Sequence, residues 1–186
     1  MNIRSCDSLS TKFLSDFPVL WEKTENIDLT SVLLDYWANL GYKNGYVIFT
    51  QQKFFSDSEG EYLVDLCWSY EDEDQYDYWI ELALESEVSD DSLDGMKYDF
   101  YKIVDVKAYT KVGIFYPLLK DKDEFLNSLS KIVAFHGIKN PLENYLIILL
   151  VDHGAKEDPK KRVEVSTYKM DYNGKLTKLK EIRVDA

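Results

Sequence analysis

An uninterrupted apolar run from Tyr145 to Val151 constrains the fold of this chain more than any other segment. A strand that is apolar at every position is expected only where both faces of a sheet are covered. A shorter apolar strand, Val112 to Tyr116, precedes it, and a helical pattern from Phe125 to Val133 lies between the two. Because a strand, a helix and a strand in this order form a parallel crossover unit, the sequence predicts that both strands lie in a central sheet.

The residues before this unit predict a helix followed by a three-stranded meander and a second helix. The first helix is predicted over Asp28 to Gly41, with a cap residue at its start and an apolar stripe along one side. Aromatic and β-branched segments separated by polar turns then indicate antiparallel strands. These strands are predicted over Gly45 to Phe55, Glu61 to Tyr70 and Tyr76 to Val88, and the second helix over Leu93 to Tyr109.

The two ends of the chain carry simpler signals. Near the N-terminus, helical apolar spacing is interrupted at Pro18, and further on the pair Asp121 and Glu124 has the spacing of a capping box. At the other end, Arg162 to Tyr172 and Lys175 to Val184 flank an Asn-Gly pair, which is the strongest short-range signal for a β-hairpin.

The predicted fold class is therefore α/β (α+β), with a mixed β-sheet flanked by helices and a C-terminal β-hairpin. The length of 186 residues suits a single domain over 1–186. Within it we expect an N-terminal helical segment over 1–27, an α/β core over 28–153 and the hairpin over 160–186.

Composition narrows the classes of function. No apolar run is long enough to cross a membrane and the N-terminus has no hydrophobic signal core, so we expect a cytoplasmic protein that does not bind membranes. The two cysteines, Cys6 and Cys67, are far apart and are expected to be free thiols. A net charge of -12 argues against a protein that coats nucleic acid indiscriminately.

That charge is unevenly distributed. From Asp57 to Asp99 there are sixteen acids against the single base Lys97, whereas from Lys156 to Arg183 nine Lys and Arg outnumber five acids. One interpretation is that the C-terminal hairpin faces phosphates and that the acidic region is a patch for a basic partner. The interpretation favoured by the charge pattern alone is a solvated acidic surface with a lysine-decorated hairpin.

Acidic residues inside the predicted third strand share one face. From Trp79 to Val88 the even positions, beginning with Ile80, are mostly apolar and are expected to face a core. Because successive strand residues point to opposite faces, Glu81, Glu85 and Glu87 are expected to lie together on the outward face.

The second predicted strand adds another acid to this face. In the segment from Tyr62 to Trp68 the same alternation buries Val64 and turns Asp65 outward, so a hairpin would place Asp65 beside Glu85 and Glu87. Three converging carboxylates are hard to ionise together without a cation, and oxygen-rich clusters suit Mg²⁺. The implied chemistry is metal-assisted phosphodiester hydrolysis, and the alternative is a plain solvent-facing acidic stripe.

These residues resemble the PD-(D/E)XK, or restriction-endonuclease-like, nuclease superfamily. Its shared core is a helix, a three-stranded meander, a helix and a strand, and the region from Asp28 to Tyr116 is similar in order. The first acid of the family signature falls on Asp65, here preceded by Val64 where the signature has proline. The acid-x-lysine element falls on Glu85-Ser86-Glu87.

The resemblance implies an assignment of roles. Asp65, Glu85 and Glu87 would hold Mg²⁺ and take part in catalysis on DNA or RNA. Glu87 stands where the signature has lysine, and because some members recruit a lysine from the following helix, Lys102 is the catalytic candidate and Lys107 the second. An acid on the first helix also contributes in many members, for which the candidates are Asp35 and Glu22.

Two other functions remain open from the sequence. One is an acidic protein-binding module without catalysis, such as an immunity or anti-restriction protein, and a related one is a nuclease-like fold that has lost activity and serves in interactions. The histidines His136 and His153 are a weaker alternative, because His153 follows the central strand where an open α/β sheet can border a ligand crevice.

Overall fold

The computed structural model describes residues 5–51, 53, 55–60, 63–72, 77–89, 92–152 and 162–185. Among these residues, seven strands form one mixed sheet in the order β1-β2-β3-β4-β5-β6-β7. The strands are β1 (Val47–Thr50), β2 (Leu66–Asp72), β3 (Asp77–Glu87), β4 (Thr110–Phe115), β5 (Asn144–Asp152), β6 (Arg162–Asp171) and β7 (Leu176–Asp185). The predicted mixed sheet with flanking helices and a C-terminal hairpin is confirmed.

Strand directions follow the connections. The strands β3, β4 and β5 are parallel, because α3 and α4 lie in the connections between them and bring the chain back to the end where the previous strand began. Every other neighbouring pair of strands is antiparallel. The run in β5 that is apolar on both faces lies inside this parallel centre, as its composition predicts.

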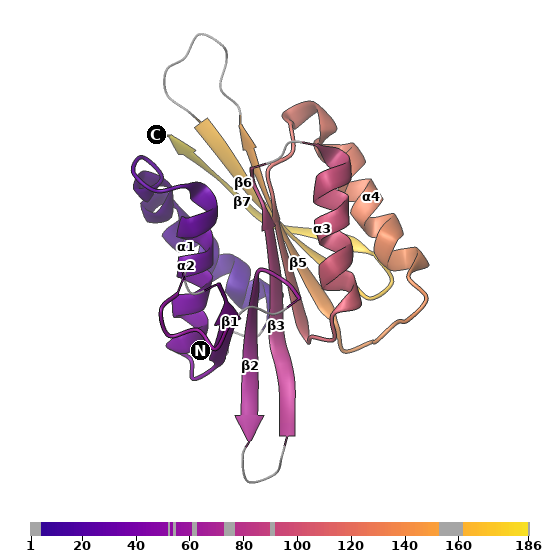
Figure 1. The fold of residues 1–186 in the computed structure, drawn as a ribbon. Coiled ribbons are helices and arrows are strands. Elements are labelled where there is room, and N and C mark those ends of the chain that lie inside the picture. The colour runs from indigo at the N-terminus through magenta and orange to yellow at the C-terminus, as the bar shows by residue number, and fades with distance from the viewer. Residues whose placement is uncertain are drawn as a thin grey trace.

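Helices cover both faces of the sheet (Figure 1). One face carries α1 (Cys6–Lys23) and α2 (Leu29–Tyr42), and the other carries α3 (Leu93–Asp105) and α4 (Lys122–Phe135), the latter preceded by the short 3-10 helix η1 (Leu119–Asp121). The sheet therefore separates two hydrophobic cores, which we call the α1/α2 core and the α3/α4 core.

The N-terminal helix runs through Pro18 without a break, so the predicted interruption is wrong. Proline removes one backbone hydrogen bond from a helix interior, at a cost of about 3 kcal/mol. In α1, Phe13 and Phe17 are fully buried, and the buried stripe continues beyond the proline with Leu20 and Trp21. Packing of this stripe against the sheet holds the helix together across the defect.

The predicted capping box at the start of α4 is not formed. The side chain of Asp121 makes no capping hydrogen bond, and its backbone is helical, with φ -101 and ψ -6. A capping side chain needs an extended backbone, but η1 runs directly into α4 and leaves Asp121 no such conformation.

Strand β3 contains an irregularity that alternation did not reveal. Trp68 pairs with Leu82 while the next residue, Ser69, pairs with Ile80, so Glu81 is an extra residue in the ladder. As a result Ile80 packs in the α3/α4 core and Leu82 in the α1/α2 core. The prediction that Ile80 shares a face with Leu82 is wrong for this reason.

Candidate functional site

The face of β3 that carries the predicted acids is covered by α3 and does not face solvent. Glu85 is only 2% exposed and Glu81 only 7%. The prediction of an outward-facing acidic stripe is therefore wrong, because the sheet has helices on both faces and the acids lie at the border of the α3/α4 core. Glu81, the extra residue of the bulge, accepts a hydrogen bond from the indole of Trp79 at 3.4 Å.

Asp65 lies beside Glu85, although it does not belong to a strand. It is in the bend immediately before β2, where the hydroxyl of Thr50 donates to its carbonyl oxygen at 2.7 Å. Its carboxylate crosses to β3 and accepts a hydrogen bond from the backbone N–H of Ser86 at 2.9 Å. The structure thus brings Asp65 to the segment Glu85 to Glu87, as the sequence predicts. Strand alternation also places Val64 on the face opposite Asp65. That part of the prediction is wrong, because Val64 packs in the α3/α4 core.

The helix that follows β3 supplies a lysine to the same place. Lys102 of α3 has its ammonium 3.4 Å from a carboxylate oxygen of Glu85 and 2.6 Å from Asp99, which lies one turn earlier on the helix. Lys102 is the lysine that the sequence singled out, whereas Asp99 was not predicted. Its sequence signal is the spacing of three residues to Lys102, which places both side chains on one side of a helix.

Glu87 completes a group that we call the acid cluster, made of Asp65, Glu85, Glu87, Asp99 and Lys102. One carboxylate oxygen of Glu87 accepts hydrogen bonds from the backbone and the hydroxyl of Ser89, at 3.0 and 2.8 Å. The negative charge of Glu87 still acts on its neighbours, because it contributes to raising the pKa of both Asp65 and Asp99.

Burial and mutual repulsion make this cluster hard to ionise. Burial, followed by the charge of Asp65, raises the pKa of Glu85 to about 8. Burial also raises the pKa of Asp65 and of Asp99. Burial lowers the pKa of Lys102, but its bonds to Asp99 and Glu85 outweigh that effect, so the pKa of the ammonium is raised and it stays charged. Four carboxylates share one cation, and the cluster lacks positive charge.

The donor atoms of the acid cluster suit a hard cation such as Mg²⁺, since all of them are carboxylate oxygens. Their present positions do not form a finished site: within the described ranges, no three His, Cys, Asp or Glu side chains are arranged to hold one metal ion. One oxygen of Asp65 and one of Glu87 are already engaged by backbone N–H groups. Binding a cation would therefore require these side chains to reorient.

Other predicted site residues lie elsewhere. Asp35 is exposed on α2, on the far side of the sheet, where it accepts a hydrogen bond from Asn39, and Glu22 is exposed on α1. Lys107 is exposed beyond the end of α3. These three do not join the acid cluster, because α1 and α2 pack on the opposite face and because Lys107 follows the last turn of α3.

Of the two histidines, His136 lies in a contact between the ends of two helices. His136 follows α4 and contacts Asp105 of α3 at 3.0 Å and the carbonyl oxygen of Ile138 at 2.8 Å, which ties two helix ends together. His153 lies outside the described residues, as do 156–161 of the basic region.

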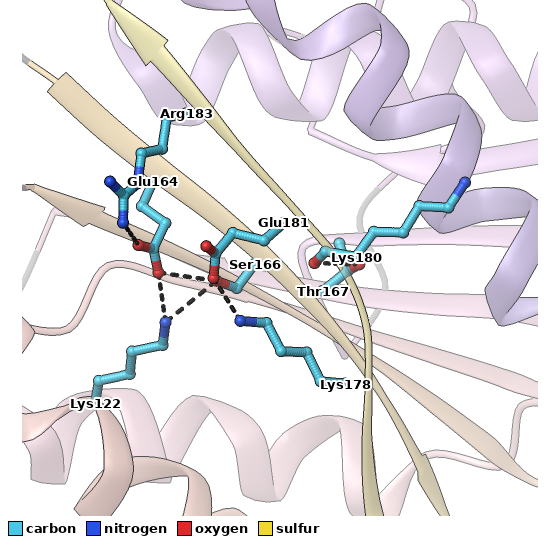
Figure 2. Close-up of polar contacts among 8 residues, drawn as sticks. All are labelled: Lys122, Glu164, Ser166, Thr167, Lys178, Lys180, Glu181 and Arg183. Carbon is cyan, nitrogen blue, oxygen red and sulfur yellow. Dashed lines mark hydrogen bonds and ion pairs between the residues drawn. The ribbon is translucent and has the colours of Figure 1, made fainter.

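A second polar group, which we call the hairpin cluster, was missed by sequence reasoning. Figure 2 shows Glu164 of β6 between two cations, Lys122 from the start of α4 and Arg183 from β7, at 2.6 and 3.5 Å. The hydroxyl of Ser166 lies within 3.2 Å of the Lys122 ammonium. Although a serine beside a lysine can serve as a nucleophile, Ser166 is fully buried, so no substrate can reach it.

Comparisons of the chain with protein-family models, with curated proteins and with solved structures found no match. Among the described residues, no helix has the length and apolar character needed to span a membrane.

Proposed function

We propose that this chain is a PD-(D/E)XK-like nuclease domain that hydrolyses phosphodiester bonds of DNA or RNA with the help of Mg²⁺. The observation that carries the proposal is the meeting of Asp65, Glu85 and Lys102 from three separate elements. They come from the bend before β2, from β3 and from α3. The succession α2, β1, β2, β3, α3, β4 supports it, since the shared core of the superfamily has the same order.

Each side chain has a role that its surroundings favour. Asp65 and Glu85 would hold the cation, because they are buried carboxylates with raised pKa values that a positive charge would help to ionise. Glu87 and Asp99 would provide further oxygens. When bound by these carboxylates, Mg²⁺ would polarise a phosphate oxygen and lower the pKa of an attacking water. Lys102, oriented by Asp99 at 2.6 Å, would stabilise the negative charge that develops on the phosphate.

A nuclease assay with matched variants tests this proposal. Single-stranded DNA, duplex DNA and RNA are incubated with the purified protein and Mg²⁺ or Mn²⁺. Asp65→Asn, Glu85→Gln and Lys102→Met are each expected to lower the cleavage rate by about 100-fold or more, because each removes a charge from the reacting centre. Asp105→Asn is the control, since Asp105 is on the same helix with a side chain that is 70% exposed.

Two results would contradict the proposal. One is the absence of metal-dependent cleavage of all three substrates by the unmodified protein. The other is cleavage by Glu85→Gln at the unmodified rate, which would assign the activity to a contaminating enzyme.

A second candidate is an acidic protein-binding module without catalysis. It is favoured by the absence, among the described residues, of three acids arranged to hold a metal, and by Glu87 in the place of the signature lysine. The net charge of -12 would then attract a basic partner. A complex with a small basic protein that dissociates as salt is raised, in a chain that neither cleaves nucleic acid nor binds Mn²⁺, would favour this function.

A further inference from the structure

A hollow at the end of the C-terminal hairpin is lined by two exposed arginines. Arg162 begins β6 and Arg183 lies near the end of β7, with side chains that are 58% and 69% exposed. The hollow has a volume of about 470 Å³, and its lining residues are Arg162, Val163, Glu164, Arg183 and Asp185.

Among the described residues at and beside this hollow, positively charged side chains outnumber acidic side chains by one. Glu164 is neutralised at 2.6 Å by Lys122, which approaches it on the side away from Arg183 (Figure 2). The contact of Arg183 with Glu164 is longer, at 3.5 Å, and Arg162 pairs with the exposed Asp185 at 3.0 Å. In this described part of the chain, the three cations Lys122, Arg162 and Arg183 thus face two acids, and each guanidinium has further N–H donors beyond its ion pair.

The register of the hairpin sets the spacing of the two arginines. Arg162 is opposite Asp185, and Glu164 is opposite Arg183, so the arginines are diagonal neighbours on adjacent strands. Diagonal neighbours are about 7 Å apart. Planar guanidinium groups at this separation suit phosphate oxygens, which they bind through paired N–H donors.

The arginines and the acid cluster lie on the same face of the sheet. Arg183 contacts Glu164, which contacts Lys122 of α4, while Glu85 contacts Lys102 of α3. They also lie toward the same end of the strands, because Glu87, Phe115, Leu149 and Ser166 form one row across four neighbouring strands, and Arg162 lies four residues beyond Ser166 on β6. Three strand spacings of about 4.8 Å and four residues of about 3.3 Å separate Glu87 from Arg162 by roughly 20 Å, the rise of about six nucleotides along one strand.

We propose that Arg162 and Arg183 form a binding site for the phosphates of a nucleic acid backbone, about six nucleotides away from the acid cluster. The inference rests on the proposed nuclease function, for which it supplies the part that holds the substrate. In a chain with a net charge of -12, such a local positive site is needed to bring a polyanion to the acids.

Binding of a fluorescein-labelled oligonucleotide, followed by anisotropy in EDTA over a range of salt concentrations, tests the site without cleavage. The double variant Arg162→Ala with Arg183→Ala is expected to bind about tenfold more weakly. For a single strand, the slope of log affinity against log salt should fall by about 1.4, that is, about 0.7 for each phosphate that is no longer neutralised. The double variant with lysine at both positions should keep the slope, because it keeps both charges.

Lys180→Ala is the matched control. Lys180 is on β7 as well but contacts Thr11 of α1 at 2.8 Å, on the opposite side of the sheet, and the change removes the same charge. A thermal melt of each variant shows that it is folded.

Three results would overturn the inference. The unmodified protein does not bind the oligonucleotide, the alanine double variant keeps its affinity and slope, or Lys180→Ala weakens binding as much as the double variant does. Inorganic phosphate forms a separate arm: displacement of the oligonucleotide by submillimolar phosphate would assign the site to a free anion and overturn the nucleic acid assignment. Loss of cleavage with arginine-dependent binding intact would count against the nuclease function alone.

Discussion

The acid cluster and the hairpin cluster occupy the same face of one sheet but differ in the balance of their charges. In the hairpin cluster the buried Glu164 has a close ammonium from Lys122 and a second cation in Arg183. In the acid cluster four carboxylates surround the single ammonium of Lys102. Glu164 and Glu85 are both buried, so the difference between these two carboxylates is in pairing and not in exposure.

The pKa values follow this difference. Burial lowers the pKa of Lys122, but the bond to Glu164 outweighs that effect and the pKa of the ammonium is raised, as expected for a satisfied ion pair. In the acid cluster the pKa of Glu85 is raised to about 8, because one lysine does not compensate for the burial and the neighbouring acids. A balanced buried pair is destabilised strongly when one partner is removed, whereas a buried group of acids that lacks positive charge is typical of a binding or catalytic site.

The largest loss of stability is expected when the hairpin cluster loses the ammonium group of Lys122. Lys122→Met keeps most of the length of the side chain but takes the close ammonium away from Glu164, which is 5% exposed and also contacts the hydroxyl of Ser166 at 3.1 Å and Arg183 at 3.5 Å. We expect the free energy of unfolding to fall by about 3 kcal/mol in urea denaturation, since removing one partner of a buried pair leaves an uncompensated charge.

Lys178→Met is the control for this variant. Lys178 pairs with Glu181 on the same strand, but its side chain is 49% exposed, so the loss should be below about 1 kcal/mol. Equal losses in the two variants would remove the distinction between buried and exposed pairing on which the comparison rests.

A smaller change in stability, and a gain instead of a loss, is expected when Glu85 of the acid cluster is replaced. Because the pKa of Glu85 is about 8 in the folded chain against an ordinary value of 4.5, the folded state binds the proton more tightly than the unfolded state. The stabilising contribution is complete below about pH 4.5 and is lost as the pH rises toward 8. Glu85→Gln cannot ionise, so it should remove most of this decline and should be more stable than the unmodified protein at pH 8 by at least about 1 kcal/mol.

Urea denaturation at several pH values between 5 and 8 measures this effect. Glu181→Gln, the same substitution on β7, is the matched control. If Glu85→Gln follows the same pH dependence as the unmodified protein, Glu85 is already compensated and the contrast between the clusters disappears. Asp65 and Asp99, whose pKa values are also raised, account for any decline that remains.

Most of the fold could be predicted from sequence, because it depends on patterns a few residues long. The apolar run in β5, the cap of α2 at Asp28 and the Asn-Gly turn each specify a local structure, and their order specifies the parallel centre. The end of β1 could not be predicted in the same way, because the strand ends at Thr50 and not at Phe55. The hydroxyl of Ser58 bonds to both the N–H and the carbonyl of Thr50, and this contact ends the strand earlier than its composition predicts.

Most residues of the acid cluster could be predicted from the sequence, but their burial and their charge balance could not. Asp65, Glu85 and Lys102 follow from strand order and a resemblance, whereas the burial of Glu85 depends on α3 covering a face that alternation alone assigns to solvent. The bulge at Glu81 changes the alternation through a cross-strand register. The pairing of Lys122 with Glu164 joins residues 42 positions apart, which no local pattern reveals.

The most direct test of the account is a calorimetric titration of the protein with Mn²⁺, in parallel with Glu85→Gln and Glu181→Gln. If the acid cluster lacks a cation, the unmodified protein should bind one Mn²⁺ with millimolar or tighter affinity and release protons from its carboxyl groups. Glu181→Gln should do the same, and Glu85→Gln should not bind. The absence of binding heat in the unmodified protein, or equal binding by Glu85→Gln, would contradict the claim that these buried acids form a cation-dependent site.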